Sequence, residues 1–245
     1  MGGVSENAER SHEYPWVRKE ELADGVTLYL GDCWEILPTL GGFDACVTDP
    51  PYGLGENAKK VAWRGKLASP TDYGEFSWDE RPAEQKVIDF CCLKSTWQII
   101  FGGNYFTLPP TSCWLVWDKL NGDTDFADCE LAWTNLPKAV RRLQWRWNGM
   151  IRAEAGKREH PTQKPRELMK WCIEQLPPNA LKIIDPFMGS GTTGVAAVKL
   201  GRQFIAIEIE PKYFDIPCRR VAEAMKQPDM FIEKPKPSVQ ETLSL

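Results

Sequence analysis

The sequence predicts an α/β fold in which a mostly parallel sheet carries helices on both faces. Short apolar segments alternate with segments of helical spacing, and most of these apolar segments are apolar throughout. A strand that is buried on both faces has this pattern, whereas a half-exposed strand alternates apolar and polar residues. The sequence shows no internal repeat of 20 to 50 residues, which argues against solenoids and propellers. We therefore expect a doubly wound, Rossmann-like sheet.

Each predicted element follows from its local pattern. The segments with helical spacing are 84–96 and 166–176, and the second places Leu168, Cys172 and Leu176 at i, i+4 and i+8 behind Pro165. A third helix is predicted over the small residues VAAVKLG, closed by Gly201. The predicted strands are VTLYL (26–30), FDACVT (43–48), WQIIF (97–101), CWLVW (113–117), LKIID (181–185) and FIAIEI (204–209).

The chain of 245 residues, 42% of them apolar, predicts one domain over 21–226. The polar segments 1–20 and 227–245 are expected to be weakly ordered tails. Residues 53–82 form a long connection with four glycines and two prolines, which predicts a mobile functional loop. The sequence contains no apolar run of about 18 residues and no apolar signal core, which predicts a cytoplasmic protein.

The charge of the chain is unevenly distributed. The net charge is -4, yet residues 138–170 hold ten Lys or Arg against three Glu. Such a strip is either a solvated face or a nucleic-acid surface, and the interleaved Trp145 and Trp147 favour the second interpretation. The eight cysteines lack CxxC spacing, so we expect reduced thiols and no metal site.

A glycine-rich loop, DPFMGSGTTG (185–194), follows the predicted strand LKIID. Gly189, Gly191 and Gly194 have GxGxxG spacing, and Glu208 stands 23 residues beyond Asp185 at the end of the next strand. An acid at that place suits ribose hydroxyls, so the loop predicts a site for an adenosine-containing cofactor. The loop alone leaves a nicotinamide cofactor, S-adenosylmethionine and a purely structural turn open.

The segment TDPPYG (48–53) directly follows the strand that ends in Val47 and Thr48. Its two prolines fix the backbone, so an acid and an aromatic ring are held stiffly at a strand end. The motif alone does not say what this acid and this ring act on.

Three motifs together carry a resemblance to a known family: TDPPYG, HPTQKP (160–165) and DPFMGSGTTG, in that order. They resemble the DNA amino-methyltransferases of the N6-adenine and N4-cytosine types, in the arrangement called β. LGDCWEIL (30–37), FGGNYF (101–106) and GRQFIAIEIEPKYF (201–214) match as well, so the resemblance spans about 26–221.

The resemblance implies an S-adenosylmethionine-dependent methyltransferase fold and methylation of the N6 amine of a flipped adenine in DNA. Asp at the first position of the DPPY motif favours adenine, with N4-cytosine as the alternative. The catalytic residues would be Asp49, Pro50, Pro51 and Tyr52, with the Tyr52 ring stacked on the base. An exocyclic base amine is a poor nucleophile because its lone pair is delocalised, and Asp49 and the carbonyl of Pro50 would accept hydrogen bonds from its two hydrogens and free that lone pair. Such a transfer requires no raised pKa at Asp49. A silent DNA-binding partner, a protein glutamine methyltransferase and a nicotinamide oxidoreductase are the rivals.

The resemblance also assigns a cofactor site. Glu208 would hold the ribose, and Lys164 would pair with the cofactor's carboxylate. Asp32 would hold the adenine amine, although a helix N-cap is its structural alternative. His160 is expected to be structural. The full predicted cofactor set is Asp32, Thr162, Gln163, Lys164, Asp185, Phe187, Gly189, Ser190, Gly191, Thr192, Thr193 and Glu208.

The expected partners are DNA and a second copy of the chain, in a bacterium or the bacterial host of a phage, within a restriction-modification system. Residues 134–160 would form a short DNA-recognition insert. The predicted DNA-binding residues are Lys59, Lys60, Trp63, Arg64, Arg141, Arg142, Arg146, Arg152, Lys157 and Arg158.

Overall fold

The structure, a computed structural model, describes residues 14–53, 82–122, 127–148, 151–152 and 163–226. Its centre is a nine-stranded sheet in the order β1-β2-β11-β10-β3-β4-β6-β5-β7, beside a two-stranded pair β8-β9. The strands are β1 (Arg18–Ala23), β2 (Val26–Leu30), β3 (Phe43–Thr48), β4 (Ser95–Phe101), β5 (Trp114–Asp118), β6 (Cys129–Thr134), β7 (Arg141–Gln144), β8 (Trp147–Asn148), β9 (Ile151–Arg152), β10 (Lys182–Asp185) and β11 (Gln203–Glu208).

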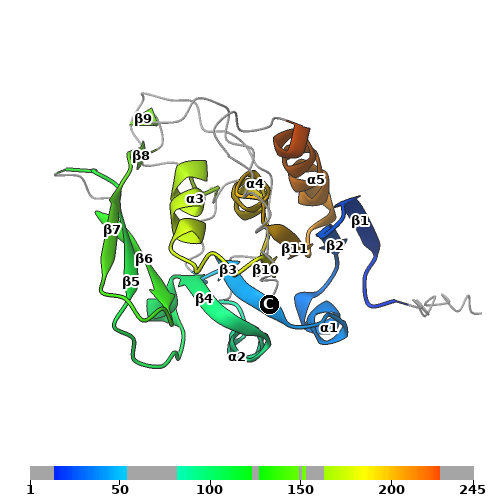
Figure 1. Ribbon diagram of the computed structural model, residues 1–245, viewed down its shortest axis with the longest axis horizontal. Helices are drawn as coiled ribbons and strands as arrows, with labels where there is room; N and C mark the ends of the chain where they lie inside the picture. The colour runs from blue at the N-terminus through cyan, green and yellow to red at the C-terminus, as the bar shows by residue number, and fades with distance from the viewer. Residues whose placement is uncertain (1–13, 54–81, 123–126, 149–150, 153–162, 227–245) are drawn as a thin grey trace, which may run out of the picture.

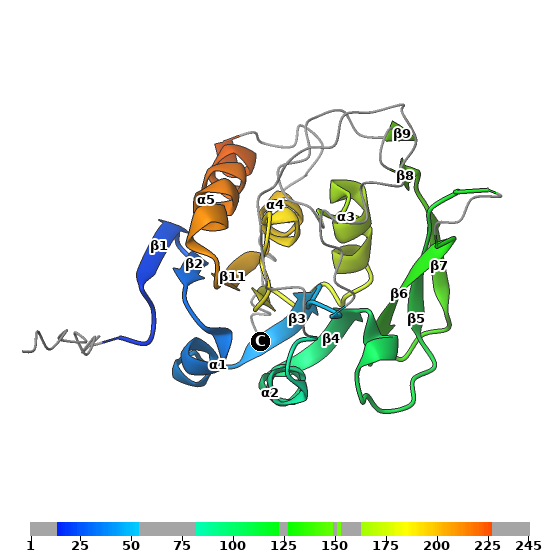
Figure 2. The same cartoon turned by 180° about the vertical axis from the view of Figure 1, so that it is seen from behind.

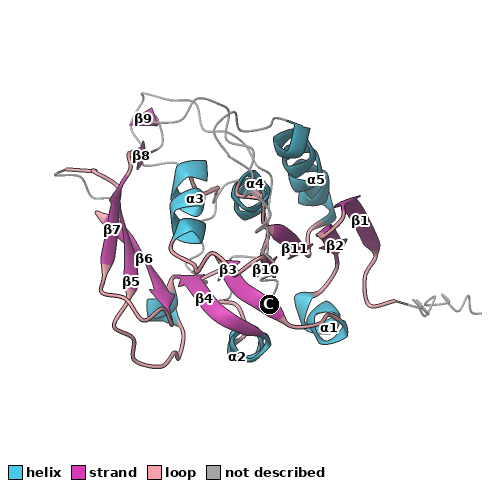
Figure 3. Ribbon diagram, viewed as in Figure 1, coloured by secondary structure: helices cyan, strands magenta, loops and turns pink. Residues whose placement is uncertain are grey.

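Helices cover both faces of the sheet (Figure 1). On one face lie α3 (Arg166–Glu174), α4 (Thr192–Lys199) and α5 (Pro211–Lys226), and on the other lie α1 (Cys33–Ile36) and α2 (Gln85–Lys94). The view from behind shows the same layers (Figure 2), and the colouring by secondary structure separates them clearly (Figure 3). The described residues also include the 3-10 turns η1 (Leu37–Thr39) and η3 (Gly103–Tyr105). The doubly wound α/β prediction is confirmed.

Strand direction decides which residues meet at the edge of the sheet. The strands β2, β11, β10, β3 and β4 are parallel, so their carboxyl ends lie at one edge. The strand β6 is antiparallel to both β4 and β5, and it therefore begins at that same edge. Ligands of open α/β sheets bind at this edge.

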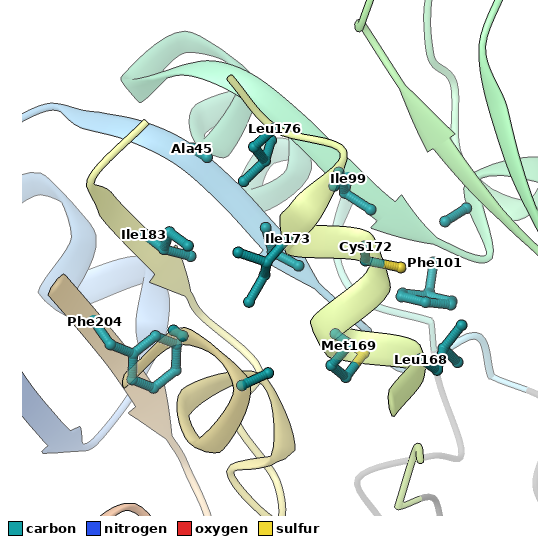
Figure 4. Packing of buried hydrophobic residues seen from close by; sticks show 14 of the residues in the cluster. Ala45, Ile99, Phe101, Leu168, Met169, Cys172, Ile173, Leu176, Ile183 and Phe204 are labelled. Atoms are coloured by element: carbon teal, nitrogen blue, oxygen red, sulfur yellow. The ribbon is translucent and has the colours of Figure 1, made fainter. Parts of the chain in front are cut away.

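The helix α3 packs on the sheet through the apolar face that its sequence spacing predicted. Ile173 of α3 lies between Ile183 of β10 and Ile99 of β4, all three fully buried (Figure 4). Leu168 and Cys172 belong to the same cluster. Because they are four residues apart on α3, they lie on one face and form a continuous apolar stripe. Because this stripe anchors the helix, the residues just before its first turn are held at the carboxyl edge of the sheet.

The predicted strands agree with the structure to within two residues at each end, but several expectations differ. The helix predicted over 84–96 ends at Lys94, because Ser95 starts β4 and its hydroxyl donates to the carbonyl of Cys91. The strand β1 begins inside the segment 1–20, and β7 places part of the segment 134–160 in the main sheet. β1 and β7 escaped prediction because they are largely exposed and polar.

The loop residues 54–81 and the tail 227–245 lie outside the described residues. In the part of the chain that the structure describes, no helix is both long enough and apolar enough to cross a membrane.

Candidate active site

A cavity of about 550 Å³ opens at the carboxyl edge of the parallel strands. Its walls come from the ends of β2, β3, β10 and β11, from the start of α2 and from the segment before α3. Segments distant in sequence therefore meet in one pocket. The residues predicted from sequence that line it are Asp32, Asp49, Pro51, Gln163, Lys164, Asp185, Phe187, Gly189, Ser190, Thr192, Thr193 and Glu208.

Asp49 is held by two neighbours directly after β3. Its Oδ2 lies 2.7 Å from Nζ of Lys164, and its Oδ1 accepts a hydrogen bond from the hydroxyl of Tyr52. Burial raises the pKa of Asp49, while the charge of Lys164 opposes that effect. The expectation of an unraised pKa at Asp49 is therefore wrong, because the sequence did not reveal how little solvent reaches this carboxylate.

Lys164 has a different partner from the one we expected. Its Nζ bridges Asp49 and Glu130, at 3.0 Å from Oε2 of Glu130, and Glu130 also lies 2.5 Å from Lys119. The ammonium thus already has two carboxylate partners within the protein. Sequence reasoning missed Glu130 altogether, since only the antiparallel direction of β6 brings this residue to the site.

The ring of Tyr52 is packed against η3. It stacks on Tyr105 with the ring centroids 5.1 Å apart and 16° between the planes. A Cβ at Gly102 would lie 2.1 Å from Cε1 of Tyr52 and 2.6 Å from both Cδ1 and Cζ, distances that put it over the ring face. Only glycine lets the backbone approach the ring this closely, and its φ of +63° also favours glycine.

Glu208 ends β11 and organises the glycine loop. Its Oε2 accepts from the backbone N–H of Gly189 at 2.8 Å, and its Oε1 accepts from that of Glu210 at 2.9 Å. Burial raises the pKa of Glu208 to about 7. Glu208 is 8% exposed as a residue and borders the cavity, so the remaining lone pairs of its carboxylate can accept hydrogen bonds from a ligand's hydroxyls.

The loop itself depends on a glycine. Gly191 has a φ of +72°, and a Cβ there would come within 2.5 Å of Cβ of Pro217 in α5. Pro217 lies inside α5, and the helix continues through it. The hydroxyls of Ser190 and Thr192 lie 3.0 Å apart at the start of α4. These contacts hold the loop against α5 and the start of α4.

Two further acids form the walls of the cavity. Asp32 accepts from the backbone N–H of Trp34 at 2.8 Å as the N-cap of α1, so the structural alternative for this residue is realised while it also lines the pocket. Asp185 accepts from the hydroxyl of Thr48 at 2.8 Å, which ties β10 to β3. Burial raises the pKa of Asp185 to about 6.

Some predicted residues lie elsewhere or outside the described chain. Arg141, Arg142 and Arg146 are exposed, on β7 and just beyond it. Pro50, Tyr52 and Gly191 are absent from the cavity lining, although each adjoins a residue that belongs to it. The structure does not describe Lys59, Lys60, Trp63, Arg64, Lys157, Arg158, His160 and Thr162, nor the side chain of Arg152.

Known proteins resemble the chain at the level of sequence. A family model described as DNA methylase matches residues 114–218. The Type II methyltransferase M.HinfI of Haemophilus influenzae is 29% identical over 280 aligned positions, which cover 93% of this chain and 74% of that protein. The Type II methyltransferase M2.MboI of Moraxella bovis is 26% identical, with 80% of this chain and 87% of that protein covered. These matches support the DNA amino-methyltransferase family for this chain.

A solved structure supports the fold of this methyltransferase. The crystal structure of the M1.HpyAVI–SAM complex superimposes with a TM-score of 0.52 and 25% identity, covering 79% of this chain and 98% of that one. The predicted fold class, a mostly parallel sheet of the methyltransferase type, is therefore confirmed. The family match also removes the nicotinamide oxidoreductase as an interpretation of the glycine loop.

Proposed function

We propose that this methyltransferase transfers a methyl group from S-adenosylmethionine to the N6 amine of an adenine flipped out of DNA. The observation that carries the proposal is that Asp49 and Glu208 border one continuous cavity. Asp49 begins the DPPY motif directly after β3, and Glu208 organises the glycine loop. A base amine and a cofactor ribose can therefore meet within the same cavity.

The lining of the cavity fits S-adenosylmethionine in its charges. Asp32, Asp49, Asp185 and Glu208 supply carboxylates at the strand ends, which suit the sulfonium, the ammonium and the ribose hydroxyls of this cofactor. The volume of about 550 Å³ lies in the range of small-molecule sites. Because Lys164 is paired with Asp49 and Glu130, we no longer assign it to the cofactor's carboxylate.

The chemistry that we assign to the chain is positioning. The cofactor supplies an activated methyl group, and in-line attack by the amine is the favourable geometry. Asp49 accepts a hydrogen bond from one N–H of the amine, and the carbonyl of Pro50 accepts one from the other N–H. These two hydrogen bonds localise the nitrogen lone pair. Pro50 and Pro51 keep these acceptors fixed, so little reorganisation is needed when the base arrives.

Adenine is proposed over cytosine because the motif begins with Asp49, which is commoner in adenine methyltransferases. N4-cytosine methylation is the second candidate. The test is to incubate the protein with S-adenosylmethionine and DNA of mixed sequence, digest to nucleosides and identify the methylated base by mass spectrometry. N6-methyladenine is the expected product. If N4-methylcytosine is the only product, the substrate is cytosine and not adenine. A result with no methylated base would favour a silent DNA-binding partner.

The DNA partner is proposed to lie along the basic strip 138–170, which includes the exposed Arg141 and Arg142. Both relatives described above carry the name Type II methyltransferase, which supports a place in a bacterial restriction-modification system. The homodimer and the recognition insert over 134–160 remain predictions.

A further inference from the structure

Four charged side chains form a chain of ion pairs that starts at the candidate catalytic acid, in the order Asp49, Lys164, Glu130 and Lys119. Nζ of Lys164 lies 2.7 Å from Asp49 and 3.0 Å from Glu130, and Nζ of Lys119 lies 2.5 Å from the other carboxylate oxygen of Glu130. The charges alternate in sign along the chain. Asp49 and Lys119 directly follow β3 and β5, and Glu130 is the second residue of β6. Lys164 precedes α3 by two residues.

Solvent reaches this chain of charges poorly. The exposed fractions of the side chains are 19% for Asp49, 11% for Lys164, 27% for Glu130 and 17% for Lys119, and Oε2 of Glu130 is fully shielded. A buried charge is costly without a partner, and breaking a buried pair leaves the other charge uncompensated. Each member therefore affects the ionisation and the position of the next.

We propose that Glu130 is a positioning residue for methyl transfer, acting on Asp49 through Lys164. This inference rests on the proposed function of Asp49. If Lys164 paired with Asp49 alone, it would fix the carboxylate but also cancel much of its negative charge. Because Glu130 shares the ammonium, Asp49 is held in one orientation and still remains a strong acceptor for the amine of the base.

The geometry around Asp49 supports this division of roles. One carboxylate oxygen accepts from Tyr52 and the other contacts Lys164, so the plane of the carboxylate is defined from both sides. A carboxylate offers about four lone-pair sites, which leaves acceptor capacity for an incoming amine. Lys164 is fixed in turn by its place before α3 and by the ring of Phe101, 5.3 Å from Nζ.

The electrostatic effects on Asp49 oppose one another. Burial raises the pKa of Asp49, Lys164 lowers it and Glu130 raises it. Burial also acts to raise the pKa of Glu130, but Lys164 and Lys119 outweigh it and lower that pKa to about 2. Glu130 therefore stays ionised at neutral pH. Two other titratable groups interact with this acid. Tyr52 donates a hydrogen bond to Asp49, and the charge of Asp49 acts to raise the pKa of Asp185.

The test compares Glu130→Gln with Lys164→Met. The titration of Asp49 is followed by carboxyl ¹³C NMR in the free protein, with the signal assigned from Asp49→Asn. Removing the charge of Glu130 should move the Asp49 midpoint to lower pH, and removing that of Lys164 should move it to higher pH.

In single turnover with S-adenosylmethionine and DNA, Glu130→Gln should slow methylation by on the order of ten- to a hundredfold. Cofactor affinity by calorimetry should change by less than about threefold, because Glu130 does not line the cavity.

Two further variants keep the test interpretable. Glu130→Asp retains the charge, so the titration midpoint of Asp49 should equal that of the wild type. This comparison stays available if Glu130→Gln fails to fold. Glu20→Gln removes another ion-paired glutamate, on the edge strand β1, and should leave titration and rate unchanged.

Midpoints that move in the same direction, or an unchanged single-turnover rate in a folded Glu130→Gln protein, would overturn the proposal. So would a Lys164→Met protein that loses cofactor affinity tenfold while Asp49 titrates as before. The titration uses neither cofactor nor DNA, so it still reports whether Glu130 and Lys164 act on Asp49 if the wild-type protein methylates no base.

Discussion

The hydroxyl of Tyr52 donates a hydrogen bond to the carboxylate of Asp49, so the aromatic ring and the acid of the DPPY motif act as one unit. The ring also stacks on Tyr105. A change at Tyr52 therefore affects both the stacking surface and the orientation of the acid.

Tyr52→Phe keeps the ring and removes the hydrogen bond. We expect turnover to fall by roughly tenfold, the cost of a hydrogen bond of about 1.5 kcal/mol, with cofactor affinity unchanged. Tyr52→Ala also removes the stacking surface, which adds about 1 to 3 kcal/mol, so its turnover should fall much further. Single-turnover rates and calorimetry measure both effects. Equal losses in the two variants would show that the ring does not hold the base.

Asp49→Ala and Glu208→Ala should separate chemistry from cofactor binding. Asp49→Ala should bind S-adenosylmethionine within a few fold of the wild type and lose about 10²- to 10³-fold in turnover. Glu208→Ala should raise the Michaelis constant of the cofactor strongly and keep most turnover at saturation. Steady-state kinetics with both substrates varied checks the pair. Wild-type turnover in Asp49→Ala would remove this acid from the reaction.

Gly102→Ala should displace the Tyr52 ring, because the new Cβ would lie 2.1 Å from Cε1. Gly122 is a matched control, since it has the same φ of +63° and no atom of the described residues lies within 4 Å of an added Cβ. Both variants should lose about 1 to 2 kcal/mol of stability through the left-handed backbone. Only Gly102→Ala should also lose turnover. Denaturant unfolding and single-turnover rates distinguish the two effects, and equal turnover in both variants would contradict the ring contact.

Glu208 should make stability depend on pH in a definite direction. Its pKa is about 7 in the folded protein against an ordinary value of 4.5, so the folded state binds its proton more tightly. Its contribution is present below pH 4.5 and is lost as the pH rises through 7. Between pH 4 and 8 the wild type should therefore lose up to about 3 kcal/mol relative to Glu208→Gln. Urea unfolding at both pH values measures this difference, and a constant difference would contradict the raised pKa.

Arg141→Ala combined with Arg142→Ala should weaken DNA binding and make its salt dependence shallower by about two units of slope, one for each lost phosphate contact. Arg219→Ala is the control, because Arg219 lies on α5 near the opposite end of the sheet (Figure 1). Binding is measured by fluorescence anisotropy across salt concentrations. An unchanged slope in the double variant would mean that β7 is a solvated face.

The sequence by itself determined the central part of the fold and most of the cavity. The strands β2, β3, β10 and β11 are apolar runs, each with an acid at its end or within two residues beyond it. This pattern is local, so it can be read without knowing what packs against the strands. The same holds for Asp49 and Glu208, which follow or end such strands. Parallel strands share one carboxyl edge, and this rule alone brings those acids together.

Only the tertiary structure decided what surrounds Asp49. Glu130 and Lys164 are 34 positions apart along the chain, and they meet because β6 runs antiparallel to β4 and α3 packs back on the sheet. Neither event leaves a local pattern in the sequence, since both depend on which non-local pairing buries the most surface. The partner of Lys164, the raised pKa of Asp49 and the approach of Gly102 to Tyr52 all follow from that packing, which is why sequence reasoning assigned Lys164 to the cofactor and missed Glu130.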